Sequence, residues 1–286
     1  MGASRQAALL FSLPVNKTEL LPDRPGIPPM AQLPEPEVVD PEALAAAYLS
    51  GKTDLICILG PTASGKTRYA VSLARELRHV TGRPAEILSA DSRQVYRGMD
   101  IGTGKDLAEY GEVPYHLIDL VPAGSRYNVY EYQAAFARAW ADIRSRGAIP
   151  LLCGGTGMWI EAVTRSYKFE KENGVPAEKL PEQPYYIGTI VSREERVARI
   201  DRRLEERLQE GMVEEIRGLL DSGVPAPELI RYGLEYKFVT QYVLGELSYE
   251  DMVVALGNAI HQFAKRQMTW FRGMERDGIR IHWVRP

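Results

Sequence analysis

Two kinds of apolar pattern follow one another along the middle of the chain. Residues 55–59, 86–90 and 148–153 are short, largely apolar runs, whereas residues 66–77 and 129–146 repeat apolar side chains every three or four positions. Short apolar runs are typical of buried parallel strands, and the longer repeat is typical of helices that cover them. The pattern therefore predicts an α/β fold in which a parallel sheet is flanked by helices.

The last third of the chain has a helical pattern. Ser192 followed by Glu195 is a capping-box sequence, and the helical pattern continues to about Ser222, where Gly223 is a typical helix stop. A further amphipathic helix is predicted over about residues 248–274. We therefore expect a C-terminal helical part beside the sheet.

Composition divides the chain into four segments. Residues 1–50 are a proline-rich leader, expected to be flexible or extended, that ends in a short helix capped by Asp40. Residues 51–165 are the predicted core, and residues 166–185 are a proline-containing loop. Residues 186–286 are predicted to be a helical segment that completes the core.

The most specific motif lies at residues 60–67, Gly-Pro-Thr-Ala-Ser-Gly-Lys-Thr, which has the pattern G-x-x-x-x-G-K-[ST]. It follows a predicted strand and opens a predicted helix, which is the context of a phosphate-binding loop (P-loop). Such a loop aims backbone N–H groups at phosphate oxygens, its lysine supplies a cation, and its threonine is the usual Mg²⁺ ligand. The predicted phosphate-binding residues are Gly60, Thr62, Ala63, Ser64, Gly65, Lys66 and Thr67. The fold is therefore expected to be P-loop NTPase-like.

Bulk composition is that of a globular enzyme. The chain has 286 residues, 45% hydrophobic and 26% charged, with a net charge of −3. The negative balance argues against a surface covered in positive charge, although a local basic patch for nucleic acid remains compatible with it.

Cys57 and Cys153 lie in apolar runs and are expected to be buried thiols in a reducing compartment. No apolar run is long enough to span a bilayer, so we expect a cytoplasmic protein.

Two further positions follow predicted strands. Asp91 comes directly after the run at 86–90, and Thr156 follows the run at 148–153 within a Gly-Gly-Thr-Gly turn. Ligands of open parallel sheets bind beyond the carboxyl ends of the strands, so both side chains are expected near the P-loop. A carboxylate there can act as a general base or bind a metal, and it can equally cap the following turn.

Together these motifs resemble those of the tRNA dimethylallyltransferases, which prenylate an adenosine beside the anticodon. The resemblance covers about residues 53–165 and 186–284. Besides the P-loop, the matching motifs are Ser-Ala-Asp-Ser at 89–92 with Tyr96, Met-Asp-Ile-Gly-Thr at 99–103, Tyr-His-Leu-Ile-Asp at 115–119, Gly-Gly-Thr-Gly at 154–157 and Ala-Lys-Arg-Gln-x-Thr-Trp at 264–270.

The resemblance implies a reaction and roles for particular residues. The P-loop would hold the diphosphate of dimethylallyl diphosphate together with Mg²⁺ on Thr67, and the nucleophile would be the N6 amine of adenine. Asp91 would take the proton of that amine, Thr156 would orient it, and Arg199 would stabilise the leaving diphosphate. From composition alone, the arginine-rich run that contains Arg199 is typical of a solvated helix face.

The resemblance also implies a tRNA-binding surface. Its predicted residues are Asp91, Ser92, Arg93, Gln94, Arg231, Lys237, Lys265, Arg266 and Arg272. Basic residues beside aromatic ones, as in residues 261–272, suit contacts to phosphates and unpaired bases, and equally suit an amphipathic core helix. We expect the protein to act as a monomer.

The chain departs from the family in two places. Residues 166–185 replace a helical insert of several tens of residues that helps to grip the anticodon stem, and Glu235 precedes Tyr236 where the family has glycine. The first departure keeps open the activity of the adenylate isopentenyltransferases, which prenylate free AMP, ADP or ATP. A small-molecule kinase using ATP, or a phosphate-binding module without activity, is a third hypothesis.

Overall fold

The computed structural model describes residues 33–165 and 179–286. Its central sheet has six strands in the order β4-β2-β6-β1-β7-β8, and every neighbouring pair is parallel. The strands of this sheet are β1 (Leu55–Leu59), β2 (Ala85–Ser89), β4 (Tyr115–His116), β6 (Ile149–Gly154), β7 (Pro184–Thr189) and β8 (Ile281–Val284). A second sheet pairs β3 (Tyr96–Arg97) with β5 (Val121–Pro122).

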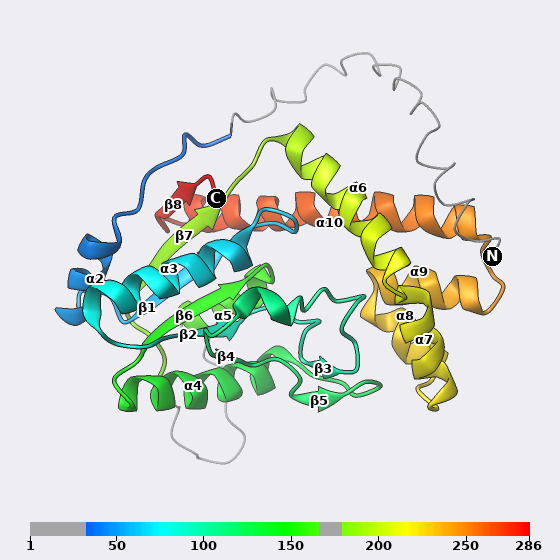
Figure 1. Ribbon diagram of the computed structural model, residues 1–286, viewed down its shortest axis with the longest axis horizontal. Helices are drawn as coiled ribbons and strands as arrows, with labels where there is room; N and C mark the ends of the chain where they lie inside the picture. The colour runs from blue at the N-terminus through cyan, green and yellow to red at the C-terminus, as the bar shows by residue number, and fades with distance from the viewer. Residues whose placement is uncertain (1–32, 166–178) are drawn as a thin grey trace.

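Helices cover both faces of the central sheet (Figure 1). The side chains of β1 alternate between two cores: Ile56 and Ile58 pack with residues of α3 (Lys66–Thr81) and α2 (Pro41–Leu49), whereas Cys57 packs with residues of α4 (Val129–Ser145) and α5 (Gly157–Thr164). Because both faces of the strand are buried, its sequence is continuously apolar.

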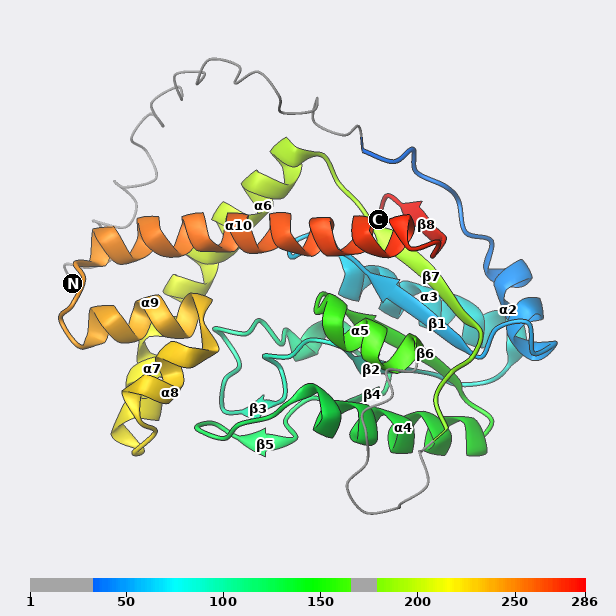
Figure 2. The same ribbon diagram turned by 180° about the vertical axis from the view of Figure 1, so that it is seen from behind.

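Five helices form the C-terminal part. They are α6 (Arg193–Gln209), α7 (Met212–Asp221), α8 (Ala226–Tyr232), α9 (Leu234–Val243) and α10 (Tyr249–Arg276). In Figures 1 and 2, α7, α8 and α9 form a group at one end of the molecule, and the long helix α10 runs from this group back to β7 and β8. The buried face of α10, with Met268 and Phe271, belongs to the same core as α4 and α5. The helical part is thereby joined to the sheet.

Most elements predicted within the core are confirmed to within a few residues. Asp40 caps α2, its side chain accepting a hydrogen bond of 3.0 Å from the backbone N–H of Glu42. Cys57 and Cys153 are buried free thiols. Among the described residues, no helix is both long enough and apolar enough to cross a bilayer.

The structure corrects the sequence analysis in the C-terminal segment. The helix predicted from Ser192 to Ser222 is two helices, because Gly211 adopts a φ of 103° between α6 and α7. Ser192 caps α6 as expected by accepting from the N–H of Glu195, but the Glu195 side chain pairs with Arg199 rather than completing the capping box.

The prediction that residues 186–286 are helical is also wrong at two stretches, which are strands: residues 186–189 belong to β7, and residues 281–284 form β8. Strand β7 lies between β1 and β8 in the sheet, so the core extends beyond residues 51–165. The predicted leader falls mostly outside the described residues, as do residues 166–178 of the predicted loop. Within the described part of the leader, the backbone N–H of Glu37 bonds to the carbonyl of Trp283, next to β8.

Candidate active site

The P-loop joins β1 to α3 and is held by contacts from distant elements. Ala63 and Gly65 have φ values of 60° and 85°, which let the chain turn tightly before α3. The hydroxyl groups of Ser64 and Thr189, at the end of β7, are hydrogen bonded at 2.6 Å. Gln267 of α10 accepts a 2.8 Å hydrogen bond from the backbone N–H of Thr62. The loop conformation therefore depends on β7 and α10 as well as on its own sequence.

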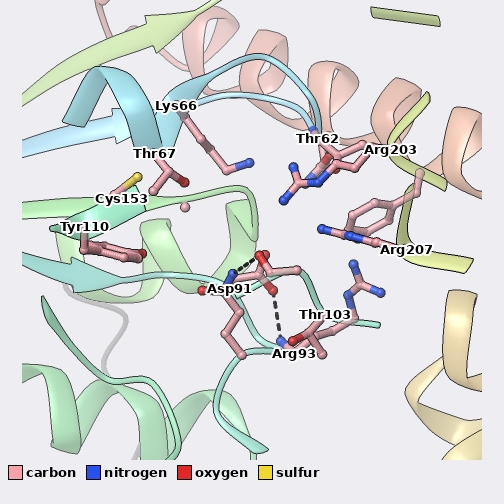
Figure 3. Close-up of a pocket in the computed structure, with 15 residues that line it drawn as sticks. Thr62, Lys66, Thr67, Asp91, Arg93, Thr103, Tyr110, Cys153, Arg203 and Arg207 are labelled. Carbon is pink, nitrogen blue, oxygen red and sulfur yellow. Dashed lines mark hydrogen bonds between the residues drawn. The ribbon is translucent and has the colours of Figure 1, made fainter. Parts of the chain in front are cut away.

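A small pocket opens beside the P-loop, beyond the carboxyl ends of β1, β2 and β6 (Figure 3). It is lined by Thr62, Lys66, Thr67, Asp91, Arg93, Gln94, Thr103, Gly104, Tyr110, Cys153, Gly154, Arg203, Arg207, Phe263 and Gln267. Lys66 and Asp91 point into it from opposite walls. The predicted placement of Asp91 beside the P-loop lysine is thus what the structure shows.

The Asp91 side chain is only partly buried and begins a tight turn. Its Oδ1 accepts a hydrogen bond of 3.0 Å from the backbone N–H of Arg93. The next residue, Ser92, donates its backbone N–H to the hydroxyl of Thr156 at 3.0 Å. The turn-capping interpretation is confirmed, and the same turn fixes a carboxylate at the wall of a polar pocket, which is the placement that the functional interpretation requires. Thr156 reaches this turn through Ser92, so it supports the Asp91 loop.

Cations dominate the pocket. Burial lowers the pKa of Lys66, and burial together with the neighbouring guanidinium of Arg207 lowers the pKa of Arg203 to about 10. The pKa of Arg207 is also lowered, mainly by burial. Burial opposes the charge on Arg93, but Glu235 and Asp91 more than offset it, and the pKa of Arg93 is raised. Desolvated cations of this kind favour a polyanionic ligand.

A second, larger pocket of about 560 Å³ adjoins the first at Lys66 and Thr67. The predicted residues Ala63, Gly65 and Arg199 line it, together with Arg202, Arg203 and Arg207. Arg199 donates to the carbonyl of Ala63 at 3.4 Å and to Glu195 at 2.6 Å. A carboxylate, a lysine and several arginines at one cleft can bind a diphosphate and remove a proton from a group beside it.

Some pocket residues were missed by sequence reasoning. Arg199, Arg203 and Arg207 are spaced four residues apart, so they share one face of α6, and that face lines the larger pocket. The interpretation of this run as a solvated face is therefore wrong for Arg207, whose side chain is 11% exposed, whereas the Arg203 side chain is 36% exposed and pairs with Asp106. Their four-residue spacing was a signal in the sequence. Phe263 and Gln267 also share a four-residue spacing, on α10.

The predicted RNA-contacting residues fall into two groups. Arg93 and Gln94 line the small pocket, and Gln94 links Ser89 to Gly104 through its side-chain amide. Asp91 lines the same pocket, and Ser92 lies beside it in the turn after β2. The other five predicted residues lie on helices: Arg231 on α8, Lys237 on α9, and Lys265, Arg266 and Arg272 on α10. Lys265 and Arg266 are exposed, and the Arg266 guanidinium lies 5.8 Å from the centre of the Phe263 ring.

Comparison with known proteins identifies the family. The sequence model described as "IPP transferase" matches residues 94–185 and 168–274. The chain is 47% identical over 288 residues to tRNA dimethylallyltransferase 1 of Parabacteroides distasonis, an alignment that covers 81% of this chain and 92% of that relative. The chain belongs to the IPP transferase family.

Other members of the IPP transferase family confirm this. Identity is also 47%, over 287 residues, to tRNA dimethylallyltransferase 2 of Porphyromonas gingivalis, covering 80% of this chain and 93% of the relative. The full-length tRNA isopentenylpyrophosphate transferase from Bacillus halodurans superimposes with a TM-score of 0.70 at 28% identity, covering 80% of this chain and 89% of that one. The expected P-loop NTPase-like fold is thereby confirmed.

The family model matches the chain in two parts. The two family matches overlap at residues 168–185, so the family pattern breaks there. The Parabacteroides alignment has 288 positions but uses only 81% of this chain's 286 residues, so that relative contains residues without a counterpart here. The break coincides with the segment in which the sequence analysis expects a shortened insert.

Glu235, the other departure from the expected family pattern, lies in the site itself. Its side chain is 3% exposed and pairs with the guanidinium groups of Arg93 and Arg207. It therefore provides a carboxylate behind the arginines of the pocket.

Proposed function

We propose that this chain transfers a dimethylallyl group from dimethylallyl diphosphate to N6 of adenosine in tRNA, at the position next to the anticodon, and releases diphosphate. The observation that carries the proposal is the shared pocket of Lys66 and Asp91, which brings an anion-binding loop to a carboxylate. The chain's relatives, named tRNA dimethylallyltransferases, support the choice of substrates.

The proposed step is a substitution at carbon. The N6 lone pair attacks the first carbon of the dimethylallyl group, the bond from that carbon to oxygen breaks, and its electron pair leaves with diphosphate. Asp91 takes the proton that N6 loses, because an aromatic amine is a weak nucleophile that needs a base. Lys66, Arg199 and the P-loop N–H groups stabilise the charge that develops on the leaving diphosphate.

We propose Mg²⁺ as the cofactor, held on the protein side by Thr67. The Thr67 hydroxyl lines both pockets beside Lys66. Among residues 33–165 and 179–286, no cluster of three or more His, Cys, Asp or Glu side chains could hold a metal. This fits Mg²⁺, which typically takes few protein oxygens and keeps water and substrate phosphates as its other ligands. When bound, the ion would neutralise charge on the diphosphate.

The activity is tested by incubating the pure protein with dimethylallyl diphosphate, Mg²⁺ and either bulk tRNA or AMP. We expect prenylated adenosine in the tRNA, detected by mass spectrometry of nuclease digests. Prenylated AMP with unmodified tRNA would instead establish the nucleotide-prenylating alternative. Absence of prenylation with both acceptors would leave the kinase or the inactive phosphate-binding module. Excess EDTA should abolish tRNA prenylation if Mg²⁺ is required. We further propose that the protein works as a monomer in the cytoplasm.

A further inference from the structure

The Glu235 carboxylate is buried between two arginines that line the pocket. It pairs with Arg93 through a short contact and lies 3.7 Å from the nearest guanidinium nitrogen of Arg207. The side chains of these arginines are only 15% and 11% exposed. A buried carboxylate is retained at a cost in solvation, which is offset here by two opposite charges. A packed apolar side chain in place of Glu235 would avoid this solvation cost. The stability of the fold therefore does not by itself explain why a carboxylate is buried here.

Arg93 has a second carboxylate close by. Its own backbone N–H bonds to Asp91, two residues earlier (Figure 3), and the Asp91 charge also favours the charged form of Arg93. The Arg93 guanidinium nevertheless donates a hydrogen bond to Glu235 on α9. The Arg93 guanidinium is therefore paired with Glu235, while the nearby Asp91 carboxylate acts on it only through its charge.

The segment that follows β3, seven residues beyond Arg93, is docked on α7 and α9 by contacts that do not involve Glu235. Glu215 of α7 accepts hydrogen bonds of 2.8, 2.7 and 3.1 Å from the backbone N–H groups of Asp100, Ile101 and Gly102. The hydroxyl of Tyr236, the residue after Glu235, donates to the same Glu215 carboxylate at 2.6 Å. Glu215 and Tyr236 therefore anchor the chain beyond β3 without Glu235, whose ion pairs are with the side chains of Arg93 and Arg207.

We propose that Glu235 is a positioning residue for the acceptor: it holds the Arg93 and Arg207 guanidinium groups at the pocket wall and keeps Arg93 from pairing with Asp91. The proposal rests on the prenyl-transfer function above, in which Asp91 must have a lone pair available for the N6 proton. Without the Glu235 charge, Arg93 would turn to Asp91, the other carboxylate at this wall. The acceptor amine would then compete with a guanidinium for the base.

The test compares Glu235→Gln, which keeps the shape of the side chain and removes its charge, with the wild type. We expect kcat for tRNA prenylation to fall by about 10-fold or more, as for a misplaced reacting group. The KM for dimethylallyl diphosphate should stay within about twofold, since the P-loop is not altered. Glu235→Asp, which restores a carboxylate, should recover part of the lost kcat. The kcat of the double variant Arg93→Gln with Glu235→Gln should be higher than that of Glu235→Gln alone. In the double variant the Arg93 guanidinium is gone and cannot pair with Asp91.

Two controls separate positioning from folding. Glu86→Gln neutralises another buried glutamate that pairs with an arginine, Arg146, and it lies on β2 outside both pockets. It should leave kcat unchanged. Active-site titration with radiolabelled dimethylallyl diphosphate gives the fraction of competent enzyme in each variant.

Three results would overturn the proposal. The first is a wild-type kcat in Glu235→Gln, and the second is a lower kcat that is fully explained by a smaller fraction of competent enzyme. The third is an equal loss of kcat in Glu86→Gln. Failure of the wild type to prenylate tRNA would instead reject the proposed function.

Discussion

The backbone N–H of Thr62 in the P-loop donates a hydrogen bond of 2.8 Å to the side-chain oxygen of Gln267, 205 residues later in the chain. The other end of the same amide donates to the carbonyl of Gly155 at 2.9 Å. Gln267 therefore ties the P-loop to the turn after β6, and it lies in the α10 segment that the sequence analysis associated with RNA. One residue of that segment therefore supports the P-loop, the proposed diphosphate site.

Gln267→Ala should weaken binding of dimethylallyl diphosphate. Two hydrogen bonds to the P-loop and the neighbouring turn are lost, each contributing about 0.5–1.5 kcal/mol, so affinity should fall by roughly 10-fold. Isothermal titration with a non-hydrolysable diphosphate analogue measures this. Gln262→Ala, at an exposed position of the same helix, is the matched control. Equal affinities of the two variants would show that the loop holds its shape without Gln267.

Asp91→Asn should lower turnover by roughly 10²-fold or more, the contribution expected of a general base. Asparagine keeps an oxygen that can accept from the N–H of Arg93, so the turn is preserved while the basic group is removed. Diphosphate affinity should change little. Asp91→Ala removes both the acceptor oxygen of the turn and the base, and its turnover should be no higher than that of Asp91→Asn. Near-normal single-turnover rates in Asp91→Asn would leave Asp91 as a turn cap only.

Lys66→Ala should weaken binding of the diphosphate analogue by roughly 10- to 100-fold, because a charge-assisted contact contributes about 1.5–3 kcal/mol. Burial lowers the pKa of Lys66, so its charged form gains from an anionic partner in the pocket. Titration calorimetry gives the affinity. If it is unchanged, the P-loop serves another ligand.

Lys265→Ala combined with Arg266→Ala should weaken tRNA binding and flatten its dependence on salt by about one to two units of slope, as expected when phosphate contacts are lost. Both residues are exposed on α10. Diphosphate affinity should be unaffected. The double variant Lys52→Ala with Arg83→Ala removes two exposed cations near the opposite ends of the strands and is the control. Filter binding over a salt series measures the affinity for tRNA and its salt slope. If both double variants have the affinity and slope of the wild type, α10 has no role in RNA binding.

Glu86→Gln should destabilise the protein in a pH-dependent way. Hydrogen bonds from Arg146 lower the pKa of Glu86 below its ordinary value of 4.5, so the carboxylate contributes stability above that value. This contribution is lost as the pH falls through the lowered pKa. Thermal unfolding should therefore show a lower Tm for Glu86→Gln at pH 7 and a smaller difference at pH 4. A difference that grows on acidification would contradict the assignment.

The sequence by itself determined the local structure of the core. Residues 55–59 are apolar on both faces and short, as a buried strand is, and residues 60–67 have the glycines and the lysine of a loop that opens a helix. The position of Asp91 at the end of the neighbouring strand placed it beside Lys66, since parallel strands end at one edge of the sheet.

Only the tertiary structure decided what lies around these residues. Strand β7 is flanked by loops and begins with Pro184, so its place between β1 and β8 is visible only from its pairing. The sequence shows Arg203 and Arg207 as surface-like charges, because periodicity defines a helix face and not what that face covers. The pairing of Glu235 with Arg93 joins residues 142 positions apart. Such contacts depend on how whole elements pack, and no local pattern encodes them.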